Sequence, residues 1–232
     1  MTSSPIKELT LYSYFYSSAA WRVRSVLALK KIPFKYQCVH LLDGQQHSED
    51  YLKTNPMHQV PSLKVDLEDG STHTITQSLT IIRFLEENYP EPAIYPKDMI
   101  LRCKSMAIAD TISGGIQPLQ NLETLLHYTD PLGLPALDQP ARTKVAQFWI
   151  DRKLVNLEKL VSSTAGKYCV GDEVSIADVS LVPQMFNARR FGLDTSKYPL
   201  LKQIDERLQE LEIFKVSHPL SCPDAPKEAG AK

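Results

Sequence analysis

The sequence has little cysteine and shows no cysteine pairing. Only four of the 232 residues are cysteine, and Cys38, Cys103, Cys169 and Cys222 are far apart and form no C-x-x-C pair. This spacing argues against a disulfide framework and against a zinc site built from cysteines. The six histidines are equally scattered, and none stands in metal-ligand spacing to another ligand. We therefore expect free, mostly structural thiols and no bound metal.

The sequence also lacks a strong net charge and a long apolar run. Its formal charge is -1 and it contains no basic stripe, which argues against nucleic acid or an anionic membrane surface as the main partner. No apolar run approaches the ~18 residues of a membrane span, and residues 1–8 lack the hydrophobic core of a signal peptide. We expect a cytoplasmic globular protein whose ligand is a small molecule.

Strand and helix patterns alternate over the first 90 residues. Strand patterns occupy residues 9–15, 34–39, 62–67 and 72–76, and helical patterns occupy residues 21–30, 48–53 and 78–89. The first strand, helix and second strand predict a βαβ unit. The turn Glu68-Asp69-Gly70 joins the last two strands into a hairpin. The expected order is β-α-β-α-β-β-α.

A proline-rich segment follows and predicts a domain boundary. Residues 90–96 contain Pro90, Pro92 and Pro96, which disrupt regular structure. Beyond them, helical patterns cover residues 99–126, 139–164, 176–187 and 198–211, and Ser175 with Asp178 forms a capping-box pattern that we assign to folding. We predict an α/β domain at residues 8–90, a linker at 91–97, an all-α domain at 98–220 and a loosely ordered tail at 221–232.

The junction between the first strand and the first helix is the strongest candidate for chemistry. Residues 17–24 read Ser-Ser-Ala-Ala-Trp-Arg-Val-Arg and begin where the helix should start. A helix N-terminus presents unpaired N–H groups and the positive end of the helix dipole, so it can stabilise an anion such as a thiolate. The simpler interpretation is that Ser18 is an N-cap that serves stability alone.

Five motifs along the chain support a family resemblance. They are Tyr-Ser-Tyr-Phe at residues 12–15 leading into residues 17–24, Asn-Pro-Met-x-Gln-Val-Pro at 55–61, Gln-Ser-Leu at 77–79, Gly-Gly-Ile-Gln-Pro-Leu-Gln-Asn-Leu at 114–122, and Val-Gly-Asp-Glu at 170–173. With these motifs the chain resembles the zeta class of glutathione transferases, the family that includes maleylacetoacetate isomerase. The resemblance implies a thioredoxin-like N-terminal domain, a helical C-terminal domain, glutathione as cofactor and a cytosolic homodimer.

The resemblance also implies roles for individual residues. Ser17 aligns with the family's catalytic serine, whose hydroxyl would donate to the glutathione sulfur, with Ser18 nearby. Val60 precedes the family's cis-proline, and its backbone would pair with the cysteinyl part of glutathione like an added strand. A simple turn proline is the alternative there. The other implied glutathione contacts are Gln46, Gln77, Ser78, Gln117 and Asn121.

Some of these contacts carry expectations or alternatives of their own. Gln46 could equally be a solvated loop residue. Gln117 and Asn121 are four residues apart, so we expect them on one face of a helix. Arg22 and Arg190 are candidates for binding substrate carboxylates, because a guanidinium can bind a carboxylate at two positions. Surface salt bridging is the alternative for both.

The sequence departs from the family at the serine motif, where Ala19 and Ala20 replace the usual Cys-Ser pair. A thiol with a pKa near ~8.5 must be stabilised as thiolate by about 2.7 kcal/mol to ionise at neutral pH. One hydrogen bond to a charged group contributes about 1.5–3 kcal/mol, and a helix N-terminus adds about 0.3–1 kcal/mol. Ser17 and the helix could therefore activate glutathione without the missing cysteine.

These arguments predict a glutathione-dependent isomerase that converts maleylacetoacetate to fumarylacetoacetate, with activity weakened or altered by the alanine pair. The same thiolate could displace halide from small electrophiles such as α-halo acids, so a specialised detoxifying transferase is the first alternative. A glutathione-binding module without catalysis is the second. Retention of Ser17 favours an enzyme, since a scaffold has no need of that hydroxyl.

Overall fold

The computed structural model describes residues 4–227, which divide into two compact units. Residues 4–93 and 211–227 form one unit, called here the sheet unit, and residues 94–210 form the other, called here the helical unit. The division at Ala93 and Ile94 falls inside the predicted linker 91–97. The expected helical domain at 98–220 is corrected at its end, because the chain from Leu211 onward packs with the sheet unit.

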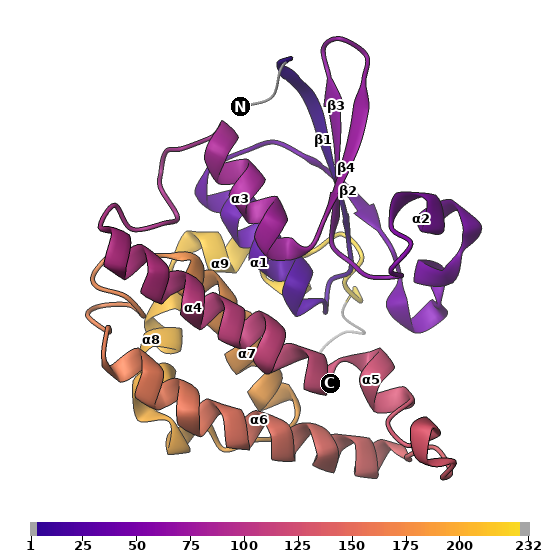
Figure 1. The fold of residues 1–232 in the computed structure, drawn as a ribbon, viewed down its shortest axis with the longest axis vertical. Helices are drawn as coiled ribbons and strands as arrows, with labels where there is room; N and C mark the ends of the chain where they lie inside the picture. Colours follow the sequence, from indigo (N-terminus) through magenta and orange to yellow (C-terminus); the bar gives the residue numbers. More distant parts are fainter. Residues whose placement is uncertain (1–3, 228–232) are drawn as a thin grey trace. The chain divides into compact units, whose positions relative to one another are not determined.

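The sheet unit is built on four strands in the order β2-β1-β3-β4 (Figure 1). The strands are β1 (Ile6–Ser13), β2 (Lys35–Cys38), β3 (Ser62–Leu67) and β4 (Thr72–Thr76). β1 pairs with β2 in parallel, and β3 runs antiparallel to both β1 and β4. The predicted βαβ unit and hairpin are therefore confirmed. β1 ends two residues earlier than expected, so Tyr14 and Phe15 lie after the strand.

Four helices belong to the sheet unit: α1 (Ser18–Leu29), α2 (Glu49–Thr54), α3 (Ser78–Asn88) and α9 (Glu212–Val216). α1 packs against α3 and also against α9 (Figure 1). Its burial is unusually complete, because every residue from Ala20 to Leu27 is buried. The core beneath it comes from β1, β3 and α3 and includes Leu11, Leu63, Val65, Ile81, Ile82 and Leu85.

The helical unit contains α4 (Met99–Gly115), α5 (Leu122–Leu126), α6 (Gln139–Ser162), α7 (Ile176–Arg190) and α8 (Pro199–Gln209). The prediction of a helical second domain is confirmed, but the single helix expected at 99–126 is wrong. α4 ends at Gly115 and a 3-10 turn, η3 (Gln117–Gln120), separates it from α5. Two glycines weaken the end of α4, and Pro118 has no N–H to continue its hydrogen bonding.

The capping box at the start of α7 is present as predicted. The Asp178 carboxylate accepts hydrogen bonds from Ser175 N (2.8 Å) and Ser175 Oγ (2.9 Å). Its other oxygen accepts from Cys169 N (2.9 Å). Asp178 is fully buried, and this burial raises the pKa of its carboxyl. The motif thus fastens the preceding loop to α7 as well as capping the helix.

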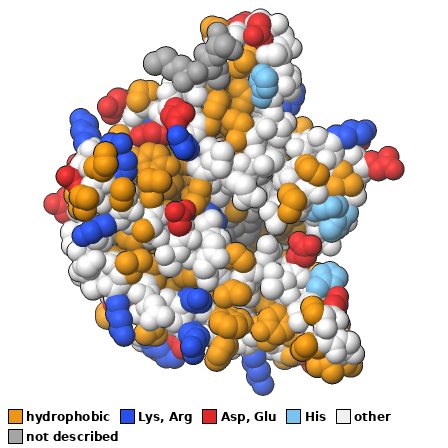
Figure 2. All heavy atoms as spheres, viewed as in Figure 1, with side chains coloured by type: hydrophobic (Ala, Val, Ile, Leu, Met, Phe, Trp, Pro, Cys, Tyr) orange, Lys and Arg blue, Asp and Glu red, His pale blue; other side chains and the backbone are white. Residues whose placement is uncertain are grey.

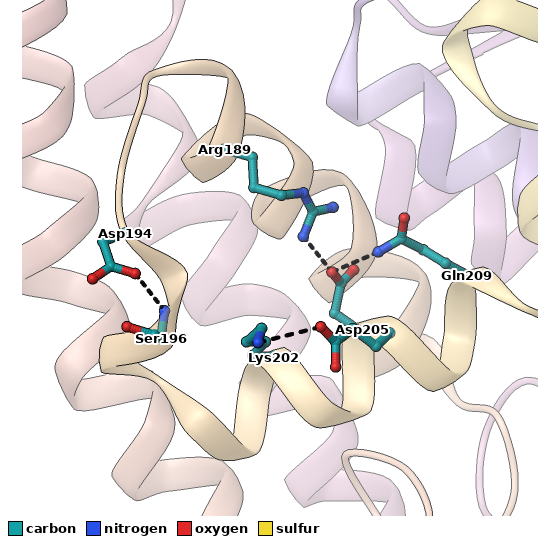
Figure 3. A network of polar contacts seen from close by, with 7 residues as sticks. Arg189, Asp194, Ser196, Lys202, Asp205 and Gln209 are labelled. Atoms are coloured by element: carbon teal, nitrogen blue, oxygen red, sulfur yellow. Dashed lines mark hydrogen bonds and ion pairs between the residues drawn. The ribbon is translucent and has the colours of Figure 1, made fainter.

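A second buried carboxyl, Asp205, lies on α8 (Figure 3). Its Oδ2 accepts hydrogen bonds from Arg189 Nη1 (2.5 Å) and Gln209 Nε2 (2.7 Å). Within residues 4–227, Oδ1 has no hydrogen-bond partner. Burial raises the pKa of Asp205 to about 6, although Arg189 acts in the opposite direction. The group therefore takes up a proton on folding at mildly acidic pH.

One face of the molecule carries charges of both signs (Figure 2). On the face drawn in Figure 2, Lys and Arg side chains are interspersed with Asp and Glu rather than gathered in one field. Among the helices described, none is both long enough and apolar enough to cross a bilayer.

Replacement of Asp205 tests its raised pKa. Because the folded state binds this proton more tightly than the unfolded state, the contribution of the Asp205 carboxyl to the free energy of unfolding falls as pH rises between about 4 and about 6. Asp205→Asn cannot titrate there, so its stability relative to wild type should increase with pH, by about 3 kcal/mol in all. Urea unfolding at several pH values measures the difference.

Asp194→Asn is the matched control for this experiment. Hydrogen bonds from Ser196 lower the pKa of Asp194, an exposed carboxylate in the same unit. Its difference from wild type should therefore change in the opposite direction and only slightly. A pH-independent difference for Asp205→Asn would contradict the raised pKa.

Candidate active site

Ser17 is the N-cap of α1, so the interpretation that gave the cap to Ser18 is wrong. Ala20 N donates to Ser17 Oγ (3.1 Å), and Trp21 N donates to Ser17 O (2.9 Å). Ser18 is the first helical residue, and both serines are partly exposed. A hydroxyl can accept through a lone pair while donating its single hydrogen elsewhere. Ser17 can therefore cap α1 and donate a hydrogen bond to an anion at the same time.

The segment between β1 and Ser17 is held by a buried arginine that sequence reasoning had assigned no role. Arg24 is 4% exposed, and its guanidinium donates to Ser13 Oγ (3.1 Å), Tyr14 O (3.4 Å) and Phe15 O (3.2 Å). Ser17 N in turn donates to Tyr14 O (2.9 Å). The backbone leading into Ser17 is therefore anchored from inside the unit. Arg24 belongs to the Trp-Arg-Val-Arg part of the sequence motif, but the motif alone does not show that its side chain points to this backbone.

The loop before β3 is shaped by its own side chains. Asn55 is buried; its Oδ1 accepts from Met57 N (3.0 Å) and its Nδ2 donates to Gln59 O (2.7 Å). The Val60–Pro61 peptide is cis, as the resemblance implied. The pairing of β3 with β1 ends at Ser62, so Val60 lies just beyond the ladder. Its backbone is placed where an extended ligand segment could continue the sheet.

Val60 is also close to the segment that precedes Ser17. The side chains of Tyr14, Phe15, Val39, Tyr51 and Val60 form one buried hydrophobic cluster. The sheet unit therefore brings together the start of α1 and the cis-proline loop, two parts of the predicted site that are over 40 residues apart in the chain.

The third part of the predicted site is the start of α3. Gln77 is exposed and adopts φ +67, a backbone conformation that non-glycine residues rarely take. Ser78 opens α3 and is buried, and its Oγ accepts from Arg22 Nη1 (2.8 Å). A positive φ held at a helix start occurs where surrounding contacts impose it, and such residues cluster at ligand sites.

Arg22 does not have the place expected of a substrate ligand. Its side chain is 2% exposed, and burial lowers its pKa to about 10. The guanidinium lies between α1 and α3 and contacts Ser78, so it is turned to the inside of the unit. The expectation that it binds a substrate carboxylate is therefore corrected. Arg22 instead positions Ser78.

Gln46 lies in a short 3-10 turn, η2 (Gln45–His47), and is partly buried. Its Nε2 is 3.2 Å from His47 Nε2, whereas its buried Oε1 has no hydrogen-bond partner within residues 4–227. A buried amide oxygen left unsatisfied is uncommon in proteins. This favours a ligand contact over the alternative of a solvated loop glutamine.

The remaining predicted residues belong to the helical unit. Gln117 begins η3 and Asn121 is the N-cap position of α5, so they do not share one helix face as expected. Between them, Gln120 forms a reciprocal amide pair with Gln184 of α7, with distances of 2.9 and 3.2 Å. Arg190 ends α7 with an exposed side chain whose guanidinium carbon is 5.1 Å from the centre of the Phe191 ring.

Sequence models of two protein families match the chain. The N-terminal domain of glutathione S-transferase matches residues 16–88, and the C-terminal domain of glutathione S-transferase matches residues 136–215. The first range holds every predicted site residue of the sheet unit. The second holds Arg190 but begins after Gln117 and Asn121.

Relatives and solved structures agree over almost the whole chain. Maleylacetoacetate isomerase of Mus musculus is 47% identical over 94% of this chain and 95% of its own. Probable maleylacetoacetate isomerase 1 of Drosophila melanogaster is 44% identical over 96% of this chain and 86% of its own. The structure of maleylacetoacetate isomerase from Anaeromyxobacter dehalogenans 2CP-1 with bound glutathione (GSH) has a TM-score of 0.85 at 42% identity, covering 96% of this chain and 100% of that one.

The family's solved structures also include the holo form of a bacterial maleyl pyruvate isomerase described as zeta class, with a TM-score of 0.84 at 32% identity over 93% of this chain and 99% of that one. Both halves of the expected fold, the thioredoxin-like domain and the helical domain, are thus confirmed. Shared identity at this level and this coverage leave one conclusion: the chain belongs to the zeta class of glutathione transferases, the enzyme family of the maleylacetoacetate isomerases.

Proposed function

We propose that the protein is a glutathione-dependent isomerase that converts maleylacetoacetate to fumarylacetoacetate, a step of phenylalanine and tyrosine breakdown in the family it belongs to. The observation that carries the proposal is Ser17, a hydroxyl at the positive end of α1 that caps the helix and still has a hydrogen to donate. The relative from Anaeromyxobacter dehalogenans supports it, since that protein also binds dicarboxyethyl glutathione and citrate in its active site.

The sheet unit fits glutathione at three places. Ser17 and Ser18 would meet the sulfur, the Val60 backbone would meet the cysteinyl amide groups, and Gln77 with Ser78 would meet the γ-glutamyl carboxylate at the α3 N-terminus. The unsatisfied Oε1 of Gln46 supplies a further acceptor. We assign Gln117 and Asn121 to additional glutathione contacts from the helical unit, as the family resemblance implies.

When bound, glutathione supplies a thiolate that adds to the cis double bond, permits rotation about the resulting single bond, and leaves again. The protein's task is to keep that sulfur ionised. Ser17 donates its hydroxyl hydrogen, worth about 1.5–3 kcal/mol towards a charged acceptor, and the α1 N-terminus adds about 0.3–1 kcal/mol. Ala19 and Ala20 bring no side-chain donor, so this stabilisation comes from Ser17, its neighbour Ser18 and backbone N–H groups.

Arg190 is our proposed ligand for a substrate carboxylate. Its exposed guanidinium at the end of α7 keeps a planar pair of donors at the surface of the helical unit. We further propose a cytoplasmic homodimer that acts on small electrophilic or dicarboxylic substrates. Ala19, which is partly exposed where Ala20 is buried, gives a second candidate function, transfer of glutathione to α-halo acids, because its small side chain occupies less space next to Ser18 than the family's cysteine would.

The proposed function is tested by glutathione-dependent isomerisation of maleylacetone, a stable substrate analogue, followed by absorbance with and without glutathione. Turnover that requires glutathione is the expected result. Titration calorimetry with glutathione is run in parallel. Binding without turnover would contradict the isomerase and direct the assay to α-halo acids; release of halide would then identify a transferase, and its absence a binding module.

Ser17→Ala should have two separable effects. Loss of the donated hydrogen bond should reduce glutathione-dependent turnover by about 10- to 100-fold. Loss of the N-cap should lower the free energy of unfolding by about 1 kcal/mol. Asp138→Ala is the matched control, since Asp138 caps α6 through the same contact, accepting from Ala141 N at 2.8 Å. It should lose similar stability and keep full activity; equal activity of the two variants would remove Ser17 from the mechanism.

Arg22→Met and Arg190→Met form a contrasting pair. Arg22→Met removes the donor that fixes Ser78, so it should weaken glutathione binding about tenfold and leave the KM for maleylacetone unchanged once glutathione is saturating. Arg190→Met should leave glutathione binding unchanged and raise the KM for maleylacetone. Calorimetry with glutathione and steady-state kinetics at saturating glutathione measure the two effects. A raised maleylacetone KM in Arg22→Met would restore Arg22 as a substrate ligand.

A further inference from the structure

The chain from α9 onward returns to the part of the sheet unit that carries Ser17. There the Asp224 carboxylate accepts hydrogen bonds from three donors: Phe15 N at 3.0 Å, Tyr36 Oη at 2.6 Å and Cys38 Sγ at 3.3 Å. Phe15 is in the segment between β1 and α1, and the other two donors are on β2. Residues 221–225 of the tail that was expected to be loosely ordered therefore make defined contacts, while 228–232 of that predicted tail lie outside the described residues.

The donors around Asp224 keep their protons. Burial and the hydrogen bond to Asp224 raise the pKa of Tyr36 far above its ordinary value and raise the pKa of Cys38 to about 12. Both groups therefore remain O–H and S–H donors across the physiological range. A carboxylate has lone pairs for about four donors, so all three contacts can be made together.

A second contact of the same segment lies along α1. Ser217 is buried, and its Oγ accepts from Trp21 Nε1 (2.9 Å) and is 3.0 Å from Ser25 Oγ. Its carbonyl accepts from Arg24 Nε (3.2 Å). α9 itself packs on α1 (Figure 1). The C-terminal segment is thus fastened to the helix that Ser17 caps.

Arg24 and Asp224 hold the same short stretch of backbone from opposite sides. Arg24 binds the carbonyls of Tyr14 and Phe15, and Asp224 binds the N–H of Phe15. Tyr14 O also accepts the N–H of Ser17. A shift of the Phe15 peptide would therefore be passed directly to Ser17. Burial lowers the pKa of Arg24, and the negative charge of Asp224 acts against that shift.

We infer that Asp224 is a positioning residue for the reaction: through the Phe15 peptide, the C-terminal segment sets the direction in which Ser17 presents its hydroxyl. The inference rests on the proposed role of Ser17. The simpler alternative is that this segment only stabilises the fold. The two differ in what is lost with Asp224, since only a positioning role predicts that the ionisation of bound glutathione changes in a protein that remains folded.

Asp224→Asn is the main test, because it keeps the shape and replaces one acceptor oxygen with a donor. Three measurements are made: hydrogen exchange of the amides in residues 14–18, the pH dependence of the ultraviolet absorbance of bound glutathione thiolate, and kcat for maleylacetone. We expect faster exchange, a titration of the bound thiol at higher pH, and kcat lower by about tenfold with the maleylacetone KM unchanged.

Three other variants separate positioning from stability. Asp224→Glu keeps the carboxylate and should restore part of the loss. Tyr36→Phe removes one donor but leaves the Phe15 contact, so it should lower stability and keep the wild-type thiol titration. Asp69→Asn changes an exposed carboxylate that accepts from Ser71 N at 2.9 Å and Ser71 Oγ at 2.6 Å in the β3–β4 turn, and should change none of the three measurements.

The inference is overturned if Asp224→Asn leaves the thiol titration and kcat at wild-type values, or if Tyr36→Phe reduces kcat as much as Asp224→Asn. Failure of this inference can also be distinguished from failure of the proposed function. A wild-type protein that ionises glutathione but does not isomerise maleylacetone would refute the isomerase, while the thiol titration and the exchange of residues 14–18 would still decide the role of Asp224.

Discussion

The hydrogen bonds of the buried Arg24 guanidinium are the interaction on which the backbone around Ser17 depends. A buried cation is costly unless its N–H groups find acceptors, and Arg24 meets this requirement with Ser13 Oγ and with the carbonyls of Tyr14, Phe15 and Ser217. These acceptors come from the end of β1, the connection to α1 and the C-terminal segment. Satisfying one side chain therefore brings three separate parts of the chain together next to Ser17.

Stability and chemistry meet in one hydroxyl. Ser17 uses a lone pair to accept from Ala20 N, and the same interaction holds the oxygen still and leaves its hydrogen to be directed elsewhere. An N-cap is thus well suited to activating a thiol, because the side chain that caps the start of the helix also lies at the positive end of the helix dipole. Ala19 and Ala20, which follow the two serines, favour helix formation and add no competing donor or acceptor, which leaves the thiolate to the serines and the backbone.

Local patterns in the sequence predicted local structure well. The bounds of β3 and β4, the hairpin turn and the Ser175–Asp178 capping box each depend on residues close together in the chain, and they were correct. The failures have the opposite origin. Arg22 was expected to bind a substrate carboxylate because nothing local shows that α3 covers it, and Asp224 was expected in a loosely ordered tail because its donors are 186 to 209 residues away. The break after Gly115 follows from the two glycines and Pro118, but the apolar periodicity that continues on both sides of it predicts a single helix.

The charge states of the two units also depend differently on pH, because the sheet unit buries arginines and the helical unit buries carboxyl groups. Arg22 in the sheet unit has a pKa lowered only to about 10, so it stays charged throughout the neutral range and Ser78 keeps its donor. Asp205 in the helical unit has a pKa raised to about 6, so it changes charge within the range in which an enzyme is assayed. A fall in stability as pH rises towards neutrality therefore reports the helical unit, whereas a rise in turnover over higher pH reports ionisation of the thiol held by the sheet unit. The two profiles separate folding from chemistry without any substitution in the site.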